Sequence, residues 1–233
     1  MTAVNEAISA LKAGKFVLVH DDKDREDEVD MVVAAEHVKP RHISIMRRHA
    51  GGLVCLAIKN EITVKLGLIY MHDMLQRLSN ITPLFAKLVY GKAPYGDRPS
   101  FSIAINHRNT YTGITDIDRA LTINKMAEVC KNINSTGVAD FATNFHAPGH
   151  VPILIASKSP LQERAGHTEL CVYLMDLAGL TPAATICEML DSSTYKSLSI
   201  EKAKKYANKF GIPILEANQL KNVQTSVTAS RIS

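Results

Sequence analysis

The residues best suited to chemistry lie in an acidic segment near the start of the chain, DDKDREDEVD, residues 21–30. Seven acids and two bases give this segment a charge of −5, which leaves +9 for the rest of a chain whose net charge is +4. Four of the acids alternate along it, at Asp24, Glu26, Glu28 and Asp30, so an extended backbone would project them to one side. Carboxylate oxygens grouped in this way suit a hard divalent cation.

Other interpretations of the acidic segment are a solvated charged turn and a calcium-binding loop. A run of charges in a loop is often no more than a solvated turn. An EF-hand loop is excluded, because a frame that starts at Asp22 or Asp24 does not supply both the glycine at the sixth position and the glutamate at the twelfth. An anionic small molecule with a metal cation, or weak binding of nucleic acid, would each suit the basic remainder of the chain.

A second candidate cluster is the segment ERAGHTE, residues 163–169. Arg164 offers a fork for a phosphate, and Gly166 lets the backbone approach a ligand closely. His167 and Thr168 then open a predicted helix, whose first amides favour an anion. The alternative is an ordinary helix start with a surface histidine.

Two further candidates lie next to apolar strands. The segment HAPGH, residues 146–150, precedes a predicted strand, and a histidine such as His150 could there be a satisfied core residue. Glu188, in TICEM, follows an apolar strand and is either a surface residue or a buried base with a raised pKa.

The pattern of apolar residues and turn formers predicts one α/β domain of the α+β type, with helices around a mixed β-sheet, over residues 1–233. Residues 219–233 have few apolar anchors and are expected to fray. Strands are predicted at 15–20, 31–35, 53–58, 101–107, 151–155 and 183–186. Helices are predicted at 5–13, 40–49, 118–132, 168–177 and from 199 to about 210, with short helices and loops over 60–99.

Composition excludes several classes of protein. Hydrophobic residues make up 46% and charged residues 21% of the chain, ordinary values for a soluble globular protein. No apolar run approaches the roughly 18 residues of a membrane span, and the N-terminus lacks the pattern of a signal peptide. The four cysteines form no CxxC pair, which indicates reduced thiols and a cytoplasmic location. No nucleic-acid-binding motif is present.

Six motifs together resemble the 3,4-dihydroxy-2-butanone 4-phosphate synthase family. They occur in the family's order over about residues 5–215 and read DREDEVD, GGLVC, FSIAINHR–TGIT–DRA, HAPGHV, RAGHTE and TICEM. The chain looks most like the stand-alone archaeal form, since no GTP cyclohydrolase domain follows. It departs from many members at Asp27 and Val29, where they have Asn and Gly, and at Ala165, where they have a second arginine.

The resemblance implies the fold of that family, a homodimer with its two sites at the subunit interface, and a Mg²⁺ or Mn²⁺ cofactor. The metal would be bound by Glu26 and His167. Catalytic roles fall on His150 and Glu188, with Glu28 or Asp30 as a proton shuttle and Cys55 in a supporting role. The substrate would contact Arg25, Glu26, Asp30, Thr112 in a loop that also holds Thr115, and the segment Arg164, Ala165, Gly166, His167 and Thr168.

The implied reaction converts D-ribulose 5-phosphate to 3,4-dihydroxy-2-butanone 4-phosphate and formate in riboflavin biosynthesis. It would pass through a metal-stabilised enediolate, loss of water, a skeletal rearrangement and expulsion of C4, with no part for nucleic acid or a membrane. One alternative is a metal-dependent isomerase or aldolase for another phosphosugar, which would release no formate. Another is a non-catalytic module that binds anions or RNA, whose binding would be strongly salt-sensitive.

Overall fold

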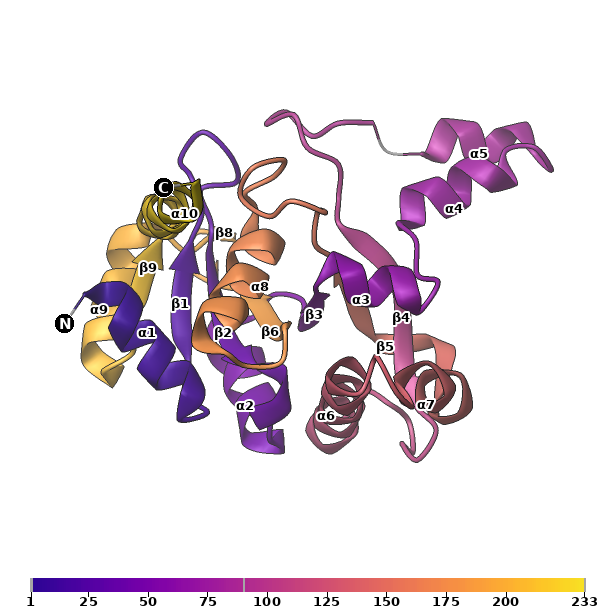
Figure 1. The fold of residues 1–233 in the computed structure, drawn as a ribbon, viewed down its shortest axis with the longest axis horizontal. Helices are drawn as coiled ribbons and strands as arrows, with labels where there is room; N and C mark the ends of the chain where they lie inside the picture. Colours follow the sequence, from indigo (N-terminus) through magenta and orange to yellow (C-terminus); the bar gives the residue numbers. More distant parts are fainter. Residues whose placement is uncertain (1, 90, 233) are drawn as a thin grey trace.

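The computed structural model of the chain describes residues 2–89 and 91–232, and its centre is a seven-stranded mixed β-sheet (Figure 1). The strand order is β4-β5-β3-β6-β2-β1-β9, in which β1 and β9 are parallel, β3 and β5 are parallel, and the other neighbours are antiparallel. The strands are β1 (Val17–His20), β2 (Val29–Ala34), β3 (Cys55–Ile58), β4 (Phe101–His107), β5 (Phe145–Ile155), β6 (Ala183–Glu188) and β9 (Ile214–Glu216). A separate hairpin pairs β7 (Leu190–Asp191) with β8 (Lys196–Ser197).

Helices cover both faces of the sheet because the central strands are apolar on both sides. One face packs against α1 (Ala3–Lys12), α8 (His167–Ala178) and α10 (Ala217–Ile232). The other packs against α2 (Pro40–Ile45), α6 (Asp116–Lys131) and α9 (Ile200–Phe210). In β2, residues alternate between the two cores: Met31 and Val33 face α2 and α6, whereas Val32 and Ala34 face α1 and α8.

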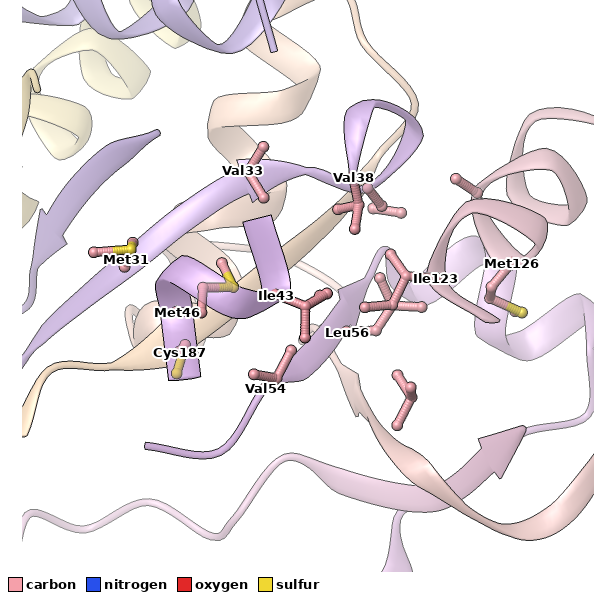
Figure 2. Close-up of a cluster of buried hydrophobic side chains, with 14 of the residues drawn as sticks. Met31, Val33, Val38, Ile43, Met46, Val54, Leu56, Ile123, Met126 and Cys187 are labelled. Atoms are coloured by element: carbon pink, nitrogen blue, oxygen red, sulfur yellow. The ribbon is translucent and has the colours of Figure 1, made fainter. Parts of the chain in front are cut away.

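The core on the α2 and α6 side is continuous and closely packed. Figure 2 shows Ile43 of α2 and Ile123 of α6 beside Leu56 of β3 in this core. All three side chains are fully buried. Truncation of any one of them to alanine would cost about 2–5 kcal/mol of stability.

Helix ends follow the expected local signals. Thr115 caps α6 by accepting a hydrogen bond from the Asp118 amide, and Ser199 caps α9 in the same way through the Lys202 amide. The helical segment that begins at Pro40 continues through a π-helical turn (Met46–Ala50) and ends at Gly51, which has a positive φ of 93°. The predicted cap of α9 and the predicted end of the 40–49 helix are therefore confirmed.

Several parts of the fold differ from the sequence-based expectation. Strand β5 begins at Phe145 rather than Val151, because the HAPGH segment pairs with the end of β4 across a bulge. A short helix α7 (Gly137–Asn144) and the strands β7, β8 and β9 were not predicted. Residues 219–232 belong to α10, in which Leu220 is fully buried, and the expected fraying of this segment stays a prediction.

Segment 60–99 contains α3 (Asn60–Lys65), α4 (Met71–Leu78) and α5 (Pro83–Leu88), in agreement with the predicted short helices and loops. Figure 1 shows α4 and α5 standing away from the rest of the sheet, at the end opposite α1 and α10. The chain then returns from α5 towards the start of β4. In the part of the chain that the structure describes, no helix has both the length and the hydrophobicity to cross a bilayer.

Candidate active site

The carboxylate of Asp21 organises the acidic segment into a tight loop. Asp21 is buried, and its Oδ2 accepts hydrogen bonds from the Glu26 amide (3.2 Å) and Arg25 Nη1 (2.9 Å). Its Oδ1 accepts one from the Glu28 amide (3.0 Å). Sequence reasoning assigned Asp21 no role, although two backbone amides and an arginine converge on it.

The loop is turned rather than extended, so the expectation that four alternating acids project to one side is wrong. Asp24 is exposed, whereas Glu26 is partly buried and Asp30 is almost fully buried. Asp27 has a positive φ of 54°, a conformation that Asp and Asn tolerate better than most residues, and its Oδ1 lies 2.9 Å from His20 Nε2. The turn at Asp27 thus accounts for an Asn or Asp at this position.

Glu26 and His167 face each other across the loop. His167 Nδ1 lies 3.2 Å from Glu26 Oε2, and its Nε2 lies 3.1 Å from the carbonyl oxygen of Glu28. Burial opposes ionisation of Glu26, but hydrogen bonds from His167 and Tyr95 and the charge of Arg25 lower its pKa to about 2. Burial also disfavours a charged His167, yet the nearby charge of Asp30 and the contact with Glu26 raise its pKa to about 10.

Two further carboxylates lie beside this pair. Asp30 is buried at the start of β2, opposite Glu188 in β6. Burial, together with the charge of Glu188 but against that of His167, raises the pKa of Asp30 to about 7. Burial likewise raises the pKa of Glu188, whose Oε2 accepts a hydrogen bond from the Leu53 amide (2.8 Å). Glu188 therefore fits the alternative of a half-buried base with a raised pKa rather than that of a surface residue.

The ERAGHTE segment folds around a fully buried glutamate, Glu169. Glu169 Oε2 contacts Arg164 Nη1 (2.5 Å) and accepts a hydrogen bond from the Gly166 amide, and its Oε1 accepts one from the Ser157 amide (2.9 Å). At Gly166, a β-carbon would lie 2.6 Å from Arg25 Nη2. A glycine is needed here because the Arg25 guanidinium packs directly on the backbone.

A loop that carries no recognised motif completes the group. In the segment between α5 and β4, the Tyr95 hydroxyl donates a hydrogen bond to Glu26 Oε1 (2.7 Å), and the Arg25 guanidinium lies over the Tyr95 ring. Asp97 Oδ2 lies 3.0 Å from Arg25 Nε and 3.4 Å from Arg164 Nε. Sequence reasoning missed both residues, because no spacing or motif within 60–99 marks them.

These residues surround a cavity of about 180 Å³. Of the sequence-predicted site residues, Glu26, Asp30, Arg164, His167, Thr168 and Glu188 line it, and we call these six the cavity cluster. Tyr95 and Ser100 also line it. A larger cavity, of about 670 Å³, lies among α1, α2 and α9 and is lined by none of the predicted site residues.

Two other predicted residues gather elsewhere, around Asn106 at the end of β4. The Asn106 side chain contacts His150 twice, through the His150 amide (2.8 Å) and Nδ1 (3.2 Å). It also packs against Gly113, beside Thr112. Thr112 and His150 are exposed. We call Asn106, Thr112, Gly113 and His150 the Asn106 group. In the described chain, no hydrogen bond or ion pair joins His150 to Glu188.

The remaining predicted residues have other surroundings. Glu28 Oε1 accepts a hydrogen bond from the Ser197 hydroxyl of β8 and does not line the cavity. Cys55 is only 1% exposed, and burial strongly raises the pKa of its thiol. Thr115 caps α6, as described above. Ala165 precedes Gly166 in the loop that leads into α8.

The residues present fit a divalent cation. Oxygen or nitrogen atoms of Asp21, Glu26 and His167 lie within 4.8 Å of one another. Both oxygens of Asp21 accept hydrogen bonds from backbone amides that shape the loop, whereas the oxygens of Glu26 contact only side chains, so Glu26 and His167 are the better ligand candidates. The carboxylates that raise the pKa of His167 would also favour a cation at this place, and metal binding would require the neutral imidazole.

The sheet and its two helical layers define a mixed α/β protein with a polar cavity among its titratable residues. Residues 5–223 match the family model described as 3,4-dihydroxy-2-butanone 4-phosphate synthase. A protein of that name from Methanothermobacter thermautotrophicus is 45% identical over 217 residues, which cover 93% of each chain. The chain therefore belongs to the 3,4-dihydroxy-2-butanone 4-phosphate synthase family, a family of enzymes.

Solved structures agree with this assignment. A crystal structure of 3,4-dihydroxy-2-butanone 4-phosphate synthase from Candida albicans has a TM-score of 0.73 and 32% identity, over 96% of this chain and 97% of that chain. A further synthase structure, in complex with two magnesium ions, has a TM-score of 0.74 and 28% identity, over 94% of each chain. The predicted fold class is thereby confirmed.

Proposed function

We propose that this chain converts D-ribulose 5-phosphate to 3,4-dihydroxy-2-butanone 4-phosphate and formate, a step of riboflavin biosynthesis. Membership of the synthase family supports the product. The main observation behind the proposed substrate and site is an unpaired carboxylate oxygen of Asp30. Its Oδ1 is buried and accepts no hydrogen bond from the described residues, in a carboxylate that lines the same cavity as Glu26, His167 and Arg164. A substrate hydroxyl would satisfy this oxygen.

Each end of the substrate has a matching part of the cavity. Arg164 supplies a guanidinium fork beside the N-terminus of α8, where backbone amides favour the phosphate. Asp30 and Glu188 also line the cavity and lie opposite each other on the neighbouring strands β2 and β6. Asp30 is suited to take a proton from the carbon next to the ketone, and Glu188 to move a proton in the later steps.

Glu26 and His167 would hold a magnesium or manganese ion. When bound, the cation would act as a Lewis acid that stabilises negative charge on adjacent substrate oxygens. The contacts that orient Glu26, from Tyr95 and Arg25, fix one carboxylate oxygen towards His167. These contacts would keep the proposed ligand atoms of Glu26 and His167 close together even without a bound cation.

We propose further that the Asn106 group of one chain completes the cavity cluster of a second copy in a homodimer. Three observations support this arrangement. His150 and Thr112 do not line the cavity of their own chain. Both are exposed, and apolar side chains nearby are exposed with them: Tyr111 at 97%, Ile114 at 51% and Ile117 at 69%. A second copy that covered these side chains would bring His150 to a cavity without altering the fold of either chain.

The test is incubation of the purified protein with D-ribulose 5-phosphate and Mg²⁺, followed by assay for formate. We expect formate in equal amount to the four-carbon phosphate, and none after removal of the metal by a chelator. Glu188→Gln should abolish formate, whereas Glu128→Gln, an exposed glutamate of α6, serves as the matched control. Turnover of the substrate without formate would refute the proposal in favour of an isomerase or aldolase.

A further inference from the structure

The turn at residues 93–97 brings a carboxylate between two arginines of the site. Backbone hydrogen bonds from Ala93 to the Asp97 carbonyl and from Gly96 to the Ala93 carbonyl close this turn. Asp97 Oδ2 then lies within 3.4 Å of the Nε atoms of both Arg25 and Arg164. One carboxylate oxygen is thus the shared partner of two guanidinium groups.

The two arginines retain donors that this carboxylate satisfies poorly or not at all. Arg25 Nη2 is buried and has no hydrogen-bond partner among the described residues, and the buried Arg164 Nε has Asp97 Oδ2 only at ion-pair distance, 3.4 Å, without a hydrogen bond. Buried guanidinium donors are seldom left unpaired. A phosphate group offers more acceptor oxygens than a carboxylate, so it could satisfy both donors at once.

Of the carboxylates that contact these arginines, Asp97 has the fewest other partners. Glu26, which also contacts Arg25, is held in addition by the Tyr95 hydroxyl and His167. Asp21 and Glu169 are fully or almost fully buried, and each accepts hydrogen bonds from two backbone amides. Asp97 keeps 28% of its side chain exposed, and among the described contacts its carboxylate bonds only to arginine. Asp97 can therefore leave without unsatisfying the backbone, whereas Asp21 and Glu169 cannot.

We propose that Asp97 is an internal anion that holds Arg25 and Arg164 in place until the phosphate group of the substrate displaces it. This inference rests on the proposed function for the identity of the phosphate ester. Asp97 would then be a positioning residue that sets phosphate affinity, because a dianion placed against a retained Asp97 would meet a like charge. The exchange favours a ligand with more charge and more acceptors than a carboxylate, which selects phosphorylated sugars over sugar acids.

The experiment is titration calorimetry of inorganic phosphate against the metal-free protein and the variant Asp97→Asn, which keeps the size of the side chain. If Asp97 occupies the arginines most of the time, the variant should bind phosphate about tenfold more tightly, because the competent fraction rises towards one. Asp97→Glu keeps the charge and should not tighten binding. Asp176→Asn, which removes the same charge from the far end of α8, measures the effect of net charge alone.

Steady-state kinetics supplies a second measurement. Asp97→Asn should lower KM for the phosphorylated substrate with little gain in kcat. Phosphate that binds Asp97→Asn as weakly as wild type, or more weakly, would overturn the proposal and make Asp97 a simple brace for the arginines. Because phosphate binding needs no turnover, this result is separate from the formate assay: a protein that makes no formate could still show the tightened binding.

Discussion

The cavity cluster and the Asn106 group each contain a histidine and a threonine but differ in what surrounds them. In the cavity cluster, His167 is buried and has Glu26 on one ring nitrogen and the Glu28 carbonyl on the other. In the Asn106 group, His150 is exposed and has an amide as its side-chain partner. The charged groups around the buried His167 come from its own chain. The exposed His150 would need a charged partner from a second chain.

The two groups differ in whether one chain is enough for their proposed role. The cavity cluster holds the residues that we propose to bind metal and phosphate, so we expect it to bind these ligands without a second chain. In the Asn106 group, Asp118 accepts hydrogen bonds from the Thr112 and Gly113 amides, but His150 has no acid or base partner among the described residues and would act only when placed beside a second cavity. Disruption of either group should therefore abolish turnover, but only disruption of the cavity cluster should weaken binding of the metal.

The largest effect is expected for Glu26→Gln. The substitution removes a charged metal ligand but keeps the size of the side chain, and metal stabilisation worth several kcal/mol corresponds to a loss of about a thousandfold or more in turnover. Stability should change little, since the loop is partly exposed. Formate assay, calorimetric metal titration and thermal unfolding measure the three quantities, with Glu61→Gln in α3 as the control. Normal turnover in Glu26→Gln would remove Glu26 from the metal site.

His150→Ala should also lose turnover, but its metal affinity should stay at the wild-type level. Mixed with Glu26→Gln under conditions of subunit exchange, it should recover activity. In a twofold dimer with shared sites, half of the dimers pair the two variants and one of their two sites is intact, so about a quarter of wild-type activity returns. If the mixture is only as active as the two variants measured separately and added, His150 acts within its own chain.

The sequence predicted more of the cavity cluster than of Tyr95 and Asp97, which contact and orient its side chains. Four of its six residues lie at strand ends or at a helix start, which the pattern of apolar residues identifies: Asp30, His167, Thr168 and Glu188. Glu26 and Arg164 lie in loops and were identified by their motifs. Their spatial neighbours Tyr95 and Asp97 lie in a segment of short helices without periodicity. Because a loop is positioned by tertiary contacts, the pairing of Asp97 with Arg25, 72 residues away in sequence, leaves no local signal.

The Asn106 group shows that recognising a motif does not predict its local structure. Its motif was recognised, yet we expected the HAPGH segment to precede a strand, whereas pairing with β4 extends β5 to Phe145. A cross-strand bulge and the proline in this segment break the alternation that sequence reasoning depends on. The catalytic roles expected for His150 and Glu188 stay predictions, and that of His150 depends on the dimer.

Tyr95→Phe should have an intermediate effect and would decide whether the 93–97 turn belongs to the cavity cluster. The hydroxyl of Tyr95 orients Glu26, and loss of such a partner of a metal ligand typically weakens metal binding by about 10- to 100-fold. Metal titration of wild type and Tyr95→Phe measures this directly, and Tyr111→Phe, at an exposed tyrosine outside the cavity, is the matched control. An unchanged metal affinity would make the Tyr95–Glu26 hydrogen bond incidental.

The smallest effect on turnover is expected at Cys55, which lies between the two groups in β3. Its side chain is 1% exposed and belongs to the core under α1 and α8. Burial, with the nearby charges of Glu188 and Asp30, raises the pKa of the thiol, so the thiol is neutral and is no nucleophile. Cys55→Ser should instead bury an unsatisfied hydroxyl and lower the free energy of unfolding by about 1–3 kcal/mol.

Turnover of Cys55→Ser should fall only a few-fold, because Glu188 on the neighbouring strand loses some of its rigid support. Urea unfolding measures the stability, and Cys55→Ala, which buries no hydroxyl, is the control that separates polarity from volume. Alkylation of the native wild type should leave Cys55 unmodified, since the thiol is out of reach of solvent. A native Cys55 that reacts rapidly with an alkylating agent would mean that the thiol opens into the cavity, and Cys55 would then count with the cavity cluster rather than with the core.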